Sequence, residues 1–305
     1  MKTTERVEAV QTSRLEQELK DYGQFKLIGQ GGEADVYRAH RKDTGEPAAV
    51  KIYINPEEGK RIFDRFLETP DEVLNHPGLV QRYSAGVLRD LAYVIMQYIG
   101  APSLYQAARF ENDQRNLLNW QRIRQTFSLA FLALDHLHRH GYAHRDIKAA
   151  NIMLGGKVID LDSLGRETSE RQQTISSTIN YLAPEELEGV QEHRTDVYHL
   201  TAVLYEALTG KTPLEFAAPQ LHSMNDEEQL DMAVYVHQDG LELALPQVVP
   251  IKEREHWNMF FEAGMNPVRD QRPPARIMLR CVQQLIDTEI QTGTPLYGVA
   301  RSRAA

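Results

Sequence analysis

The pattern of apolar and polar positions predicts strands near the beginning of the chain and helices further on. Short apolar runs at residues 25–28, 47–53 and 91–96 are bounded by glycine and polar residues, which is typical of strands. At residues 120–140 the apolar side chains instead recur every three or four positions, which predicts an amphipathic helix with one buried face. Residues 214–256 are acidic and irregular in pattern, and they are expected to form either a docking surface for a substrate or partner or simply a variable helix and loop.

Two further helices are predicted in the first third of the chain. Residues 4–20 are polar and helix-prone, with Leu15 and Leu19 four positions apart, and are expected to form a surface helix that packs lightly on the neighbouring strands. Residues 60–74 are also expected to be helical, with Pro70 ending or kinking the helix. The apolar face of this second helix is predicted to consist of Ile62, Phe63, Phe66 and Leu67.

Composition and charge exclude several classes of protein. Of the 305 residues, 42% are hydrophobic and 25% are charged, and the net charge of -9 argues against a general nucleic-acid-binding surface. No apolar run approaches the roughly 18 residues of a membrane span, and the N-terminus lacks the apolar segment of a signal peptide. Cys281, the single cysteine, is expected to be a buried thiol in a reducing cytoplasm. His136, His138 and His140 do not share one helical face, so no metal site is predicted there.

Residues 144–151 read H-R-D-I-K-A-A-N and carry the chemistry of the chain. Asp146, Lys148 and Asn151 stand at offsets of two and five, and an apolar run comes directly after them. The stretch resembles H-R-D-x-K-x-x-N, the catalytic loop of protein kinases. The resemblance implies that Asp146 accepts or orients the proton of the acceptor hydroxyl. It also implies that Lys148 lies near the transferring phosphoryl group and that Asn151 holds a metal ion.

Earlier stretches extend this resemblance. Residues 29–36 read G-Q-G-G-E-A-D-V and match the glycine-rich loop G-x-G-x-x-G-x-V, except that Ala34 replaces the third glycine. Glycines here let backbone N–H groups approach phosphates. Lys51 lies further along in an A-V-K arrangement and resembles the lysine that pairs the α- and β-phosphates. The resemblance implies nucleotide contacts by Ile28, Gly29, Gly31, Gly32, Ala34, Val36, Ala49, Lys51, Met96, Gln97, Ile99 and Met153.

In the family, this lysine pairs with a glutamate of the next helix. Glu68 is the predicted partner of Lys51, because it precedes H-P-G-L-V at residues 76–80, a close copy of the family's H-P-N-I-V. Its spacing to that motif is one residue shorter than usual. Asp64 and Glu72 therefore remain open alternatives.

Residues 158–165 read V-I-D-L-D-S-L-G where the family has D-F-G, and two aspartates compete for the magnesium-binding role. Asp160 is preferred because the preceding K-V-I-D copies the family's K-L-I-D alternation, although its interval from Asn151 is short and needs a tight Gly-Gly turn. Asp162 is the weaker alternative. The resemblance thus implies ATP with Mg²⁺ or Mn²⁺, the metal being held by Asn151 and Asp160.

The hydroxyl-rich residues 163–177 stand where the family has its activation loop. Arg145 resembles the arginine that pairs with a phosphorylated residue of this loop and so orders it. We therefore predict autophosphorylation, with Thr174 and Ser176 as the leading sites and Ser177 beside them.

Residues 178–185 read T-I-N-Y-L-A-P-E and are close to the family's T-x-x-Y-x-A-P-E, which seats a peptide substrate. The resemblance implies that Thr178 contacts the catalytic aspartate. It also implies two structural roles: Glu185 pairs with Arg272, and Asp196 anchors the backbone of the catalytic loop.

The motifs stand in the family's order over about residues 24–288, and the chain resembles the Hanks-type (eukaryotic-like) serine/threonine protein kinases of bacteria. The resemblance implies an α+β, two-lobed fold, with a small antiparallel β-rich lobe carrying one helix, a larger, mostly helical lobe, and ATP and Mg²⁺ between them. The implied boundaries are an N-terminal helical extension at 1–23, the small lobe at 24–98, the large lobe at 99–290 and a flexible tail at 291–305.

The predicted activity is ATP-dependent phosphorylation of serine or threonine on protein substrates in the cytoplasm, because the lysine of D-x-K favours these acceptors over tyrosine. Two alternatives stay open. One is a pseudokinase scaffold that binds nucleotide without turnover, for which the D-L-D sequence at residues 160–162 is the main opening. The other is a small-molecule kinase of the same fold, such as an aminoglycoside phosphotransferase, although those lack the A-P-E segment. A regulatory partner or a dimer is also left open.

Overall fold

The computed structural model describes residues 12–109, 118–166, 178–241, 243–247, 249–294 and 296. The chain forms two compact units. The first consists of the residues up to 76 together with 80–100, and the second of residues 77–79 together with those from 101 onwards. The finer boundaries at 23/24, 98/99 and 290/291 stay predictions.

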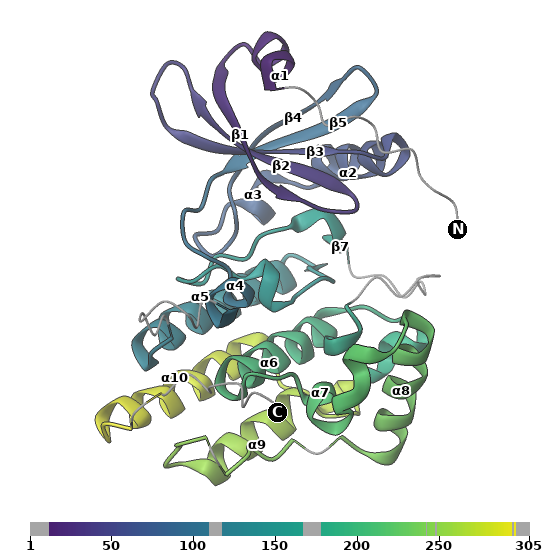
Figure 1. Cartoon of the computed structure of the whole chain (residues 1–305). Helices are drawn as coiled ribbons and strands as arrows, with labels where there is room; N and C mark the ends of the chain where they lie inside the picture. Colours follow the sequence, from purple (N-terminus) through teal and green to yellow (C-terminus); the bar gives the residue numbers. More distant parts are fainter. Residues whose placement is uncertain are drawn as a thin grey trace. The chain divides into compact units, whose positions relative to one another are not determined.

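The first unit is built on a five-stranded antiparallel sheet with strand order β1-β2-β3-β5-β4 (Figure 1). Its strands are β1 (Tyr22–Gln30), β2 (Ala34–Arg41), β3 (Pro47–Tyr53), β4 (Arg82–Leu88) and β5 (Leu91–Gln97). Its helices are α1 (Thr12–Glu18), α2 (Pro56–Glu68) and α3 (Asp71–Leu74). The three apolar runs predicted to be strands are confirmed, and β3 has the predicted bounds.

Helices α1 and α2 cover opposite faces of this sheet. Successive residues of a strand point to opposite faces. On β3, Ile52 belongs to a buried cluster that contains Leu15 of α1, whereas the next residue, Tyr53, belongs to a cluster with Ile62 of α2. Leu15 is only 1% exposed, so the prediction that this helix packs lightly is wrong. Leu15 and Leu19, which comes just after the helix, complete the core on that face.

The second predicted helix differs from the structure at its start and on its predicted apolar face. It begins earlier, at Pro56, because the side chain of Asn55 caps it by accepting hydrogen bonds from two backbone N–H groups of the first turn. It ends before Pro70, as predicted, and α3 is a separate helix after that proline. Leu67 is 64% exposed, so its assignment to the apolar face is wrong. Each residue turns a helix by about 100°, which carries Leu67 away from the buried face of Ile62.

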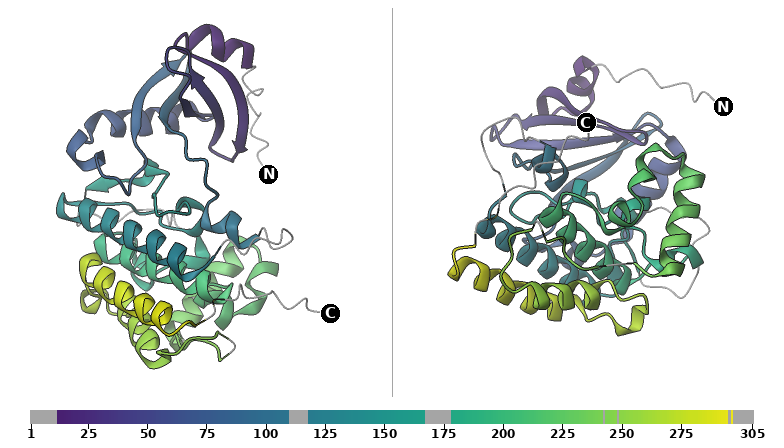
Figure 2. Two further views of the ribbon diagram at one scale, coloured as in Figure 1. Left: turned by 90° about the vertical axis from the view of Figure 1, so that its left-hand side faces the viewer. Right: turned by 60° about the horizontal axis from the view of Figure 1, so that its bottom comes forward.

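The second unit is mainly helical, and Figure 2 shows α10 alongside α5. Its helices are α4 (Leu104–Arg109), α5 (Trp120–Arg139), α6 (His193–Thr209), α7 (Pro213–Ala217), α8 (Asp226–Asp239), α9 (Arg254–Gly264) and α10 (Ala275–Gln291). The predicted amphipathic helix is α5. A strand-rich unit and a helical unit together confirm the predicted α+β fold class. No helix in the described part of the chain is long and apolar enough to cross a membrane.

Short elements connect these helices. They are the strands β6 (Tyr142–Ala143) and β7 (Gly165–Arg166), and the 3₁₀ helices η1 (Ala149–Asn151), η2 (Leu161–Ser163), η3 (Ile179–Tyr181), η4 (Pro184–Glu188), η5 (Pro219–Ser223) and η6 (Arg269–Gln271). After residue 214 the chain contains most of α7 and all of α8, whose first turn is capped by Asn225, which agrees with the expectation of a variable helix and loop. Acidic side chains in that first turn favour a helix, because they interact with its positive N-terminal end.

Cys281 is exposed, so the prediction of a buried thiol is wrong. The buried face of α10 includes Met278, Val282 and Ile286, which recur at spacings of four. Cys281 precedes Val282 by one residue and is therefore turned about 100° from this face. Apolar neighbours in sequence predicted a buried position, but the helical turn places this side chain in solvent.

Candidate active site

The polar residues of the catalytic-loop motif meet at one carboxylate in the second unit. Asp146 Oδ2 accepts a hydrogen bond from Asn151 Nδ2 at 2.8 Å and lies 2.9 Å from Lys148 Nζ. Asn151 Nδ2 also donates to the main-chain oxygen of Asp146 at 2.9 Å. The turn of η1 brings Asn151 back to Asp146. Oδ2 is thus occupied, whereas none of the described residues bonds to Oδ1 of Asp146, which can therefore accept a hydrogen bond from a hydroxyl group.

A buried carboxylate on α6 holds the backbone at the start of this loop. Asp196 is fully buried and accepts hydrogen bonds from the backbone N–H groups of His144, at 2.8 Å, and Arg145, at 2.9 Å. His138 Nε2, on α5, lies 2.9 Å from the same carboxylate. Arg145 has a φ of 68°, in the left-handed region that is costly for a non-glycine residue. The bonds to Asp196 hold the backbone in this strained conformation.

The same contacts set the ionisation of Asp196. Burial raises its pKa, but the hydrogen bond and charge of His138, the charge of His144 and the N–H of Arg145 outweigh burial and lower the pKa from 3.8 to about 2. A pKa that is lower in the folded chain stabilises the fold above pH 4, and this contribution is lost as the pH falls towards 2.

We expect the wild type to lose about 2 kcal/mol of unfolding free energy relative to Asp196→Asn between pH 4 and pH 2, because the asparagine does not titrate. Urea unfolding at a series of pH values from 5 to 2 measures this difference. If the unfolding free energies of the two proteins differed by the same amount at every pH from 5 to 2, the lowered pKa of Asp196 would be contradicted.

Asp160 adopts a strained backbone conformation, with φ 62° and ψ 68°. Such a conformation costs about 1–3 kcal/mol and persists only where neighbouring contacts enforce it. Here the preceding residue, Ile159, is held on both sides: its carbonyl lies 3.2 Å from His144 Nε2 and its N–H donates to the carbonyl of Asn151 at 2.9 Å. Asp162 lies within the regular turn of η2. The strain therefore marks Asp160 as the stronger functional candidate of the two.

The oxygen donors of this region suit a magnesium ion, which prefers carboxylate and amide oxygens. Asn151 uses its Nδ2 group for both bonds to Asp146, which leaves Oδ1 as the atom able to bind a metal. In the described residues no group of three or more His, Cys, Asp or Glu side chains could hold a metal ion. Mg²⁺ usually keeps several waters and is shared with substrate phosphates. The assignment of Asn151 and Asp160 as ligands, with Asp162 weaker, stays a prediction.

The residues predicted to contact nucleotide in the first unit lie mostly on adjacent strands. Ala49 on β3 is paired in register with Met96 on β5, and Lys51 is paired with Val36 on β2. Lys51 is half-buried and its Nζ lies 5.5 Å from the ring centroid of Tyr53, on the face opposite the Ile52 cluster. The remaining predicted positions are Ile28 and Gly29 on β1, Ala34 at the start of β2, Gln97 at the end of β5, Ile99 after it, and Met153 in the second unit.

The glycine-rich turn between β1 and β2 is open enough for a phosphate to approach its backbone. Gly31 and Gly32 are exposed, and the Gly31 N–H donates to the carbonyl of Ala34 at 3.0 Å to close the turn. A Cβ placed on Gly32 would meet no described atom within 4 Å. The turn is therefore compatible with the predicted phosphate contacts.

The carboxylate partner of Lys51 stays a prediction. Glu68 is the last residue of α2 and is exposed, and the two alternatives, Asp64 and Glu72, are exposed as well. Exposure does not separate the three. A buried carboxylate would have favoured one of the three residues as the partner, but none of the three is buried.

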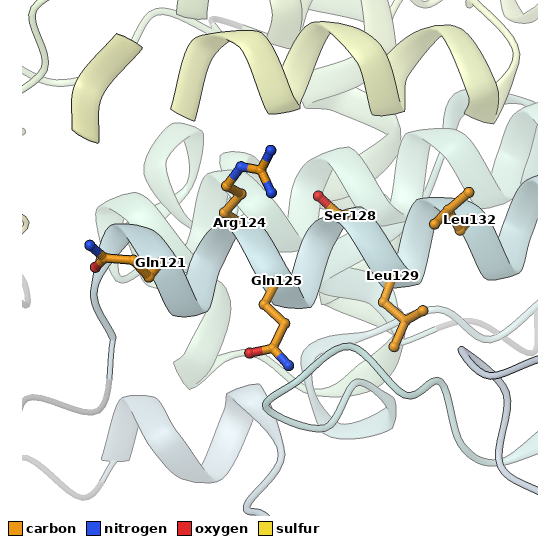
Figure 3. Close-up of a pocket in the computed structure, with 6 residues that line it drawn as sticks. All are labelled: Gln121, Arg124, Gln125, Ser128, Leu129 and Leu132. Atoms are coloured by element: carbon orange, nitrogen blue, oxygen red, sulfur yellow. The ribbon is translucent and has the colours of Figure 1, made fainter. Parts of the chain in front are cut away.

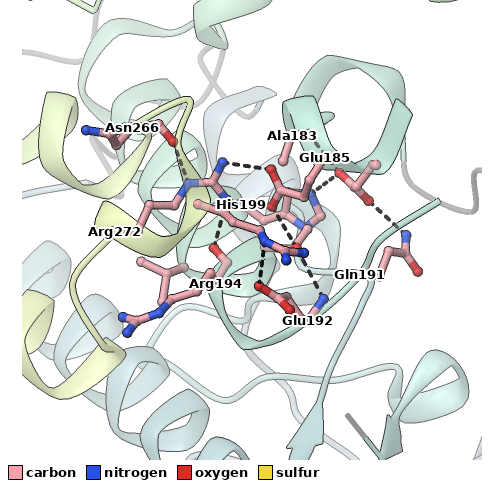
Figure 4. Close-up of polar contacts among 12 residues, drawn as sticks. Ala183, Glu185, Gln191, Glu192, Arg194, His199, Asn266 and Arg272 are labelled. Atoms are coloured by element: carbon pink, nitrogen blue, oxygen red, sulfur yellow. Dashed lines mark hydrogen bonds and ion pairs between the residues drawn. The ribbon is translucent and has the colours of Figure 1, made fainter. Parts of the chain in front are cut away.

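The segment at residues 178–185 is tied to the rest of the second unit at both ends. The Tyr181 hydroxyl donates to Glu206 at 2.5 Å and accepts from the N–H of Ala149, in the catalytic loop, at 3.4 Å. At the other end Arg272 donates to both oxygens of Glu185, at 2.6 and 2.7 Å, and both side chains are buried (Figure 4). The segment is thereby placed against the loop that carries Asp146.

The contacts described here do not include the predicted contact of Thr178 with Asp146 or the predicted phosphorylation sites. Thr178 is exposed at the start of η3, and within the described residues no hydrogen bond joins it to Asp146. Thr174, Ser176 and Ser177 lie outside the described residues. Arg145, the predicted partner of a phosphorylated loop residue, donates through Nη2 to the carbonyl of Arg166 at 2.7 Å.

Sequence reasoning missed His138 as a residue of this site. It considered His138 only as a metal ligand and rejected that role, whereas the structure pairs it with Asp196 and stacks it on His193 at 4.4 Å. One signal was available. His138 comes after the apolar positions Leu134 and Leu137 on α5, and a histidine beside a buried helical face usually has a polar partner there.

A shallow pocket on α5 is separate from the predicted site residues (Figure 3). It is lined by Gln121, Arg124, Gln125, Ser128, Leu129 and Leu132. Two of its polar side chains already have partners, since Arg124 pairs with Asp287 and Ser128 accepts a hydrogen bond from Gln283. These contacts tie α5 to α10, and nothing here points to a ligand.

Known proteins provide an independent comparison. The family model for the protein kinase domain matches residues 22–280. The chain is 30% identical over 206 residues to an Aurora kinase of Saccharomyces cerevisiae, covering 65% of this chain and 55% of that protein. It is 31% identical over 208 residues to the serine/threonine-protein kinase PrkC of Bacillus subtilis, covering 64% and 31%. It is 27% identical over 242 residues to the serine/threonine-protein kinase PknB of Mycobacterium tuberculosis, covering 73% and 38%. The chain thus spans about half or less of the length of these relatives.

Proposed function

Because the chain belongs to the protein kinase family, we propose that it transfers the γ-phosphoryl group of ATP to serine or threonine hydroxyls of protein substrates. The observation that carries this proposal is the contact of Lys148 and Asn151 with one oxygen of Asp146, which leaves the other oxygen for an acceptor hydroxyl. The names of the bacterial relatives support serine and threonine as acceptors.

In this proposal each residue has a stated task. Asp146 orients the acceptor hydroxyl and receives its proton, while Lys148 neutralises charge on the transferring group. Lys51 and the glycine-rich turn bind the phosphates of ATP. Asn151 and Asp160 hold Mg²⁺, which supplies charge neutralisation to the phosphates when it is bound.

A protein acceptor is favoured over a small molecule by the segment at residues 178–185. Its two ends are held by Tyr181 and Glu185, so it can present a fixed backbone to an extended peptide. Nothing in the described residues favours the alternative of a nucleotide-binding scaffold without turnover. A cytoplasmic location, and a regulatory partner or dimer, stay predictions from the sequence alone.

Incubation with labelled ATP and Mg²⁺ tests the proposal and the metal assignment together. We expect label on serine or threonine with the wild type, a loss of about 10²-fold or more with Asp160→Asn, and retention with Asp162→Asn, which is the matched control two residues away. Loss with Asp162→Asn alone would move the metal site to that residue. No transfer by the wild type to any protein or peptide, despite nucleotide binding, would contradict the proposed function.

We also propose autophosphorylation within residues 163–177, with Thr174 and Ser176 as the leading sites. Phosphosite mapping after incubation with ATP checks this. Phosphate confined to other parts of the chain would overturn it.

A further inference from the structure

One buried peptide group in the second unit is held by side chains at both of its polar atoms. Leu182 and Ala183 are both fully buried. The carbonyl oxygen of Leu182 lies 2.9 Å from Nε2 of His237, on α8. The N–H of the same peptide group, which belongs to Ala183, donates to Oε2 of Glu186, in η4, at 2.7 Å. Side chains from two different elements therefore fix both the position and the rotation of this peptide.

The ionisation of His237 suits this contact. Burial lowers its pKa below the ordinary value, although the hydrogen bond to Leu182 acts in the opposite direction. The ring is therefore neutral at pH 7, and the carbonyl of Leu182 holds its proton on Nε2, because only an N–H can donate to a carbonyl.

Glu186 is itself held by a buried histidine. Its Oε2 lies 2.7 Å from His199 Nε2, on α6, and its Oε1 accepts from Gln191 at 2.8 Å. Glu186 and His199 are each only 1% exposed. Burial lowers the pKa of His199, but the Glu186 carboxylate opposes this and the pKa lies above the ordinary value. A carboxylate in such a place needs these partners, because an unpaired buried charge is strongly unfavourable.

The buried Glu186–His199 pair lowers the stability of the fold in a way that two apolar side chains at these positions would not. Nδ1 of His199 is buried and has no hydrogen-bond partner in the described part of the chain. A buried polar atom left unpaired lowers stability, and apolar side chains of similar volume often replace a buried ion pair without loss. The contact of Glu186 with the N–H of Ala183 accounts for the pair, because apolar side chains could not hold that N–H.

The held peptide lies within the segment to which the proposed function assigns the seating of the substrate. On one side of it, the hydroxyl of Tyr181 contacts the catalytic loop at Ala149. On the other side, Glu185 is held by Arg272. Between these two contacts the backbone is also held locally, because the N–H of Leu182 donates to the carbonyl of Ile179 and the carbonyl of Ala183 accepts from the N–H of Glu186. The side chains of His237 and Glu186 add contacts to the Leu182–Ala183 peptide group itself.

We propose that His237 and the Glu186–His199 pair are positioning residues that hold the Leu182–Ala183 peptide in the orientation needed to bind a protein substrate. This inference rests on the proposed function, and it adds a specific determinant of substrate affinity. It separates two properties of the enzyme: these residues set the KM for the peptide substrate and leave the KM for ATP unchanged. Small displacements of a positioning group are costly for the binding of an acceptor in a productive geometry.

Steady-state kinetics with the best acceptor from a panel of serine- and threonine-containing peptides tests the proposal. We expect His237→Leu and His199→Leu each to raise the KM for the peptide about tenfold, while the KM for ATP stays at the wild-type value. His237→Gln keeps a donor near the position of Nε2 and should restore most of the peptide affinity. His256→Leu is the matched control, since His256 is an exposed histidine that contacts only Glu253 within the described residues.

A double variant separates positioning from stability. Glu186→Leu with His199→Leu removes both members of the buried pair, so no unpaired charge remains and its thermal midpoint should fall less than that of His199→Leu alone. Its KM for the peptide should nevertheless stay raised, because the N–H of Ala183 has lost its acceptor.

The outcomes are distinguishable. Absence of transfer by the wild type to every peptide would contradict the proposed function itself. Transfer by the wild type, with an unchanged peptide KM in His237→Leu and in the double variant, would overturn only the positioning inference. A second result would also overturn the positioning inference, namely that each variant raised the KM for the peptide and the KM for ATP together. A third would be a peptide KM in His237→Gln as high as in His237→Leu while both variants melted at the wild-type temperature.

Discussion

Replacing Asp146 with asparagine is expected to lower the rate of phosphoryl transfer by about 10²–10⁴-fold, the usual contribution of a general base. The substitution conserves shape. The asparagine oxygen can still accept hydrogen bonds from Lys148 and Asn151, as Oδ2 does now. Its other atom then becomes an NH₂ group, which donates rather than accepts and cannot receive the proton of an acceptor hydroxyl.

The measurement is kcat with saturating ATP and peptide, together with the Kd for ATP by calorimetry. The Kd should stay near the wild-type value, because neither of the proposed phosphate- and metal-binding groups, Lys51 and Asp160, is changed. Asp43→Asn is a matched control, since Asp43 is exposed and pairs with Arg41 between β2 and β3. A kcat within a few-fold of the wild type in Asp146→Asn would show that this carboxylate is not the base.

Arg272→Met is expected to lower the unfolding free energy by about 3–5 kcal/mol, the usual cost of removing one partner of a buried ion pair. The guanidinium has no solvent-exposed surface, and besides both oxygens of Glu185 it donates to the carbonyls of Asn266 and Arg194. It also lies 4.8 Å from the ring centroid of Tyr198. Methionine keeps much of the aliphatic volume, so the loss arises mainly from a carboxylate left buried without its cation.

Urea unfolding followed by tryptophan fluorescence measures this effect in the right part of the chain, because Trp120 and Trp257, the two tryptophans, both belong to the second unit. Arg269→Met provides the control. The side chain of Arg269 is 40% exposed and pairs at the surface with Glu192, so its loss should cost less than about 1 kcal/mol.

The double variant Glu185→Leu with Arg272→Met should be more stable than Arg272→Met alone, since it leaves no unpaired charge. If Arg272→Met were no less stable than Arg269→Met, the buried pair would not be the contact that holds this end of the segment.

The sequence by itself determined those parts that depend on neighbours along the chain. The bounds of β3 result from one apolar run between turns, and the break after α2 results from Pro70, which restricts its own backbone and that of the residue before it. The contacts among Asp146, Lys148 and Asn151 span only five residues, so one short turn suffices to form them. The contacts within such a motif can be predicted from the sequence because they join residues that are close together in the chain.

Apart from the contacts of Glu185 and Asp196 that the family resemblance implied, only the tertiary structure decided which distant side chains meet. His138 and Asp196 are 58 residues apart, and no local pattern predicts that α5 and α6 bring them together. The exposure of Cys281 and the burial of Leu15 likewise depend on which face of a helix another element covers. The same holds for His237 on Leu182, 55 residues away. Hydrophobic packing is non-directional, so a sequence specifies that a face is buried, whereas the packing of the elements specifies against which partner.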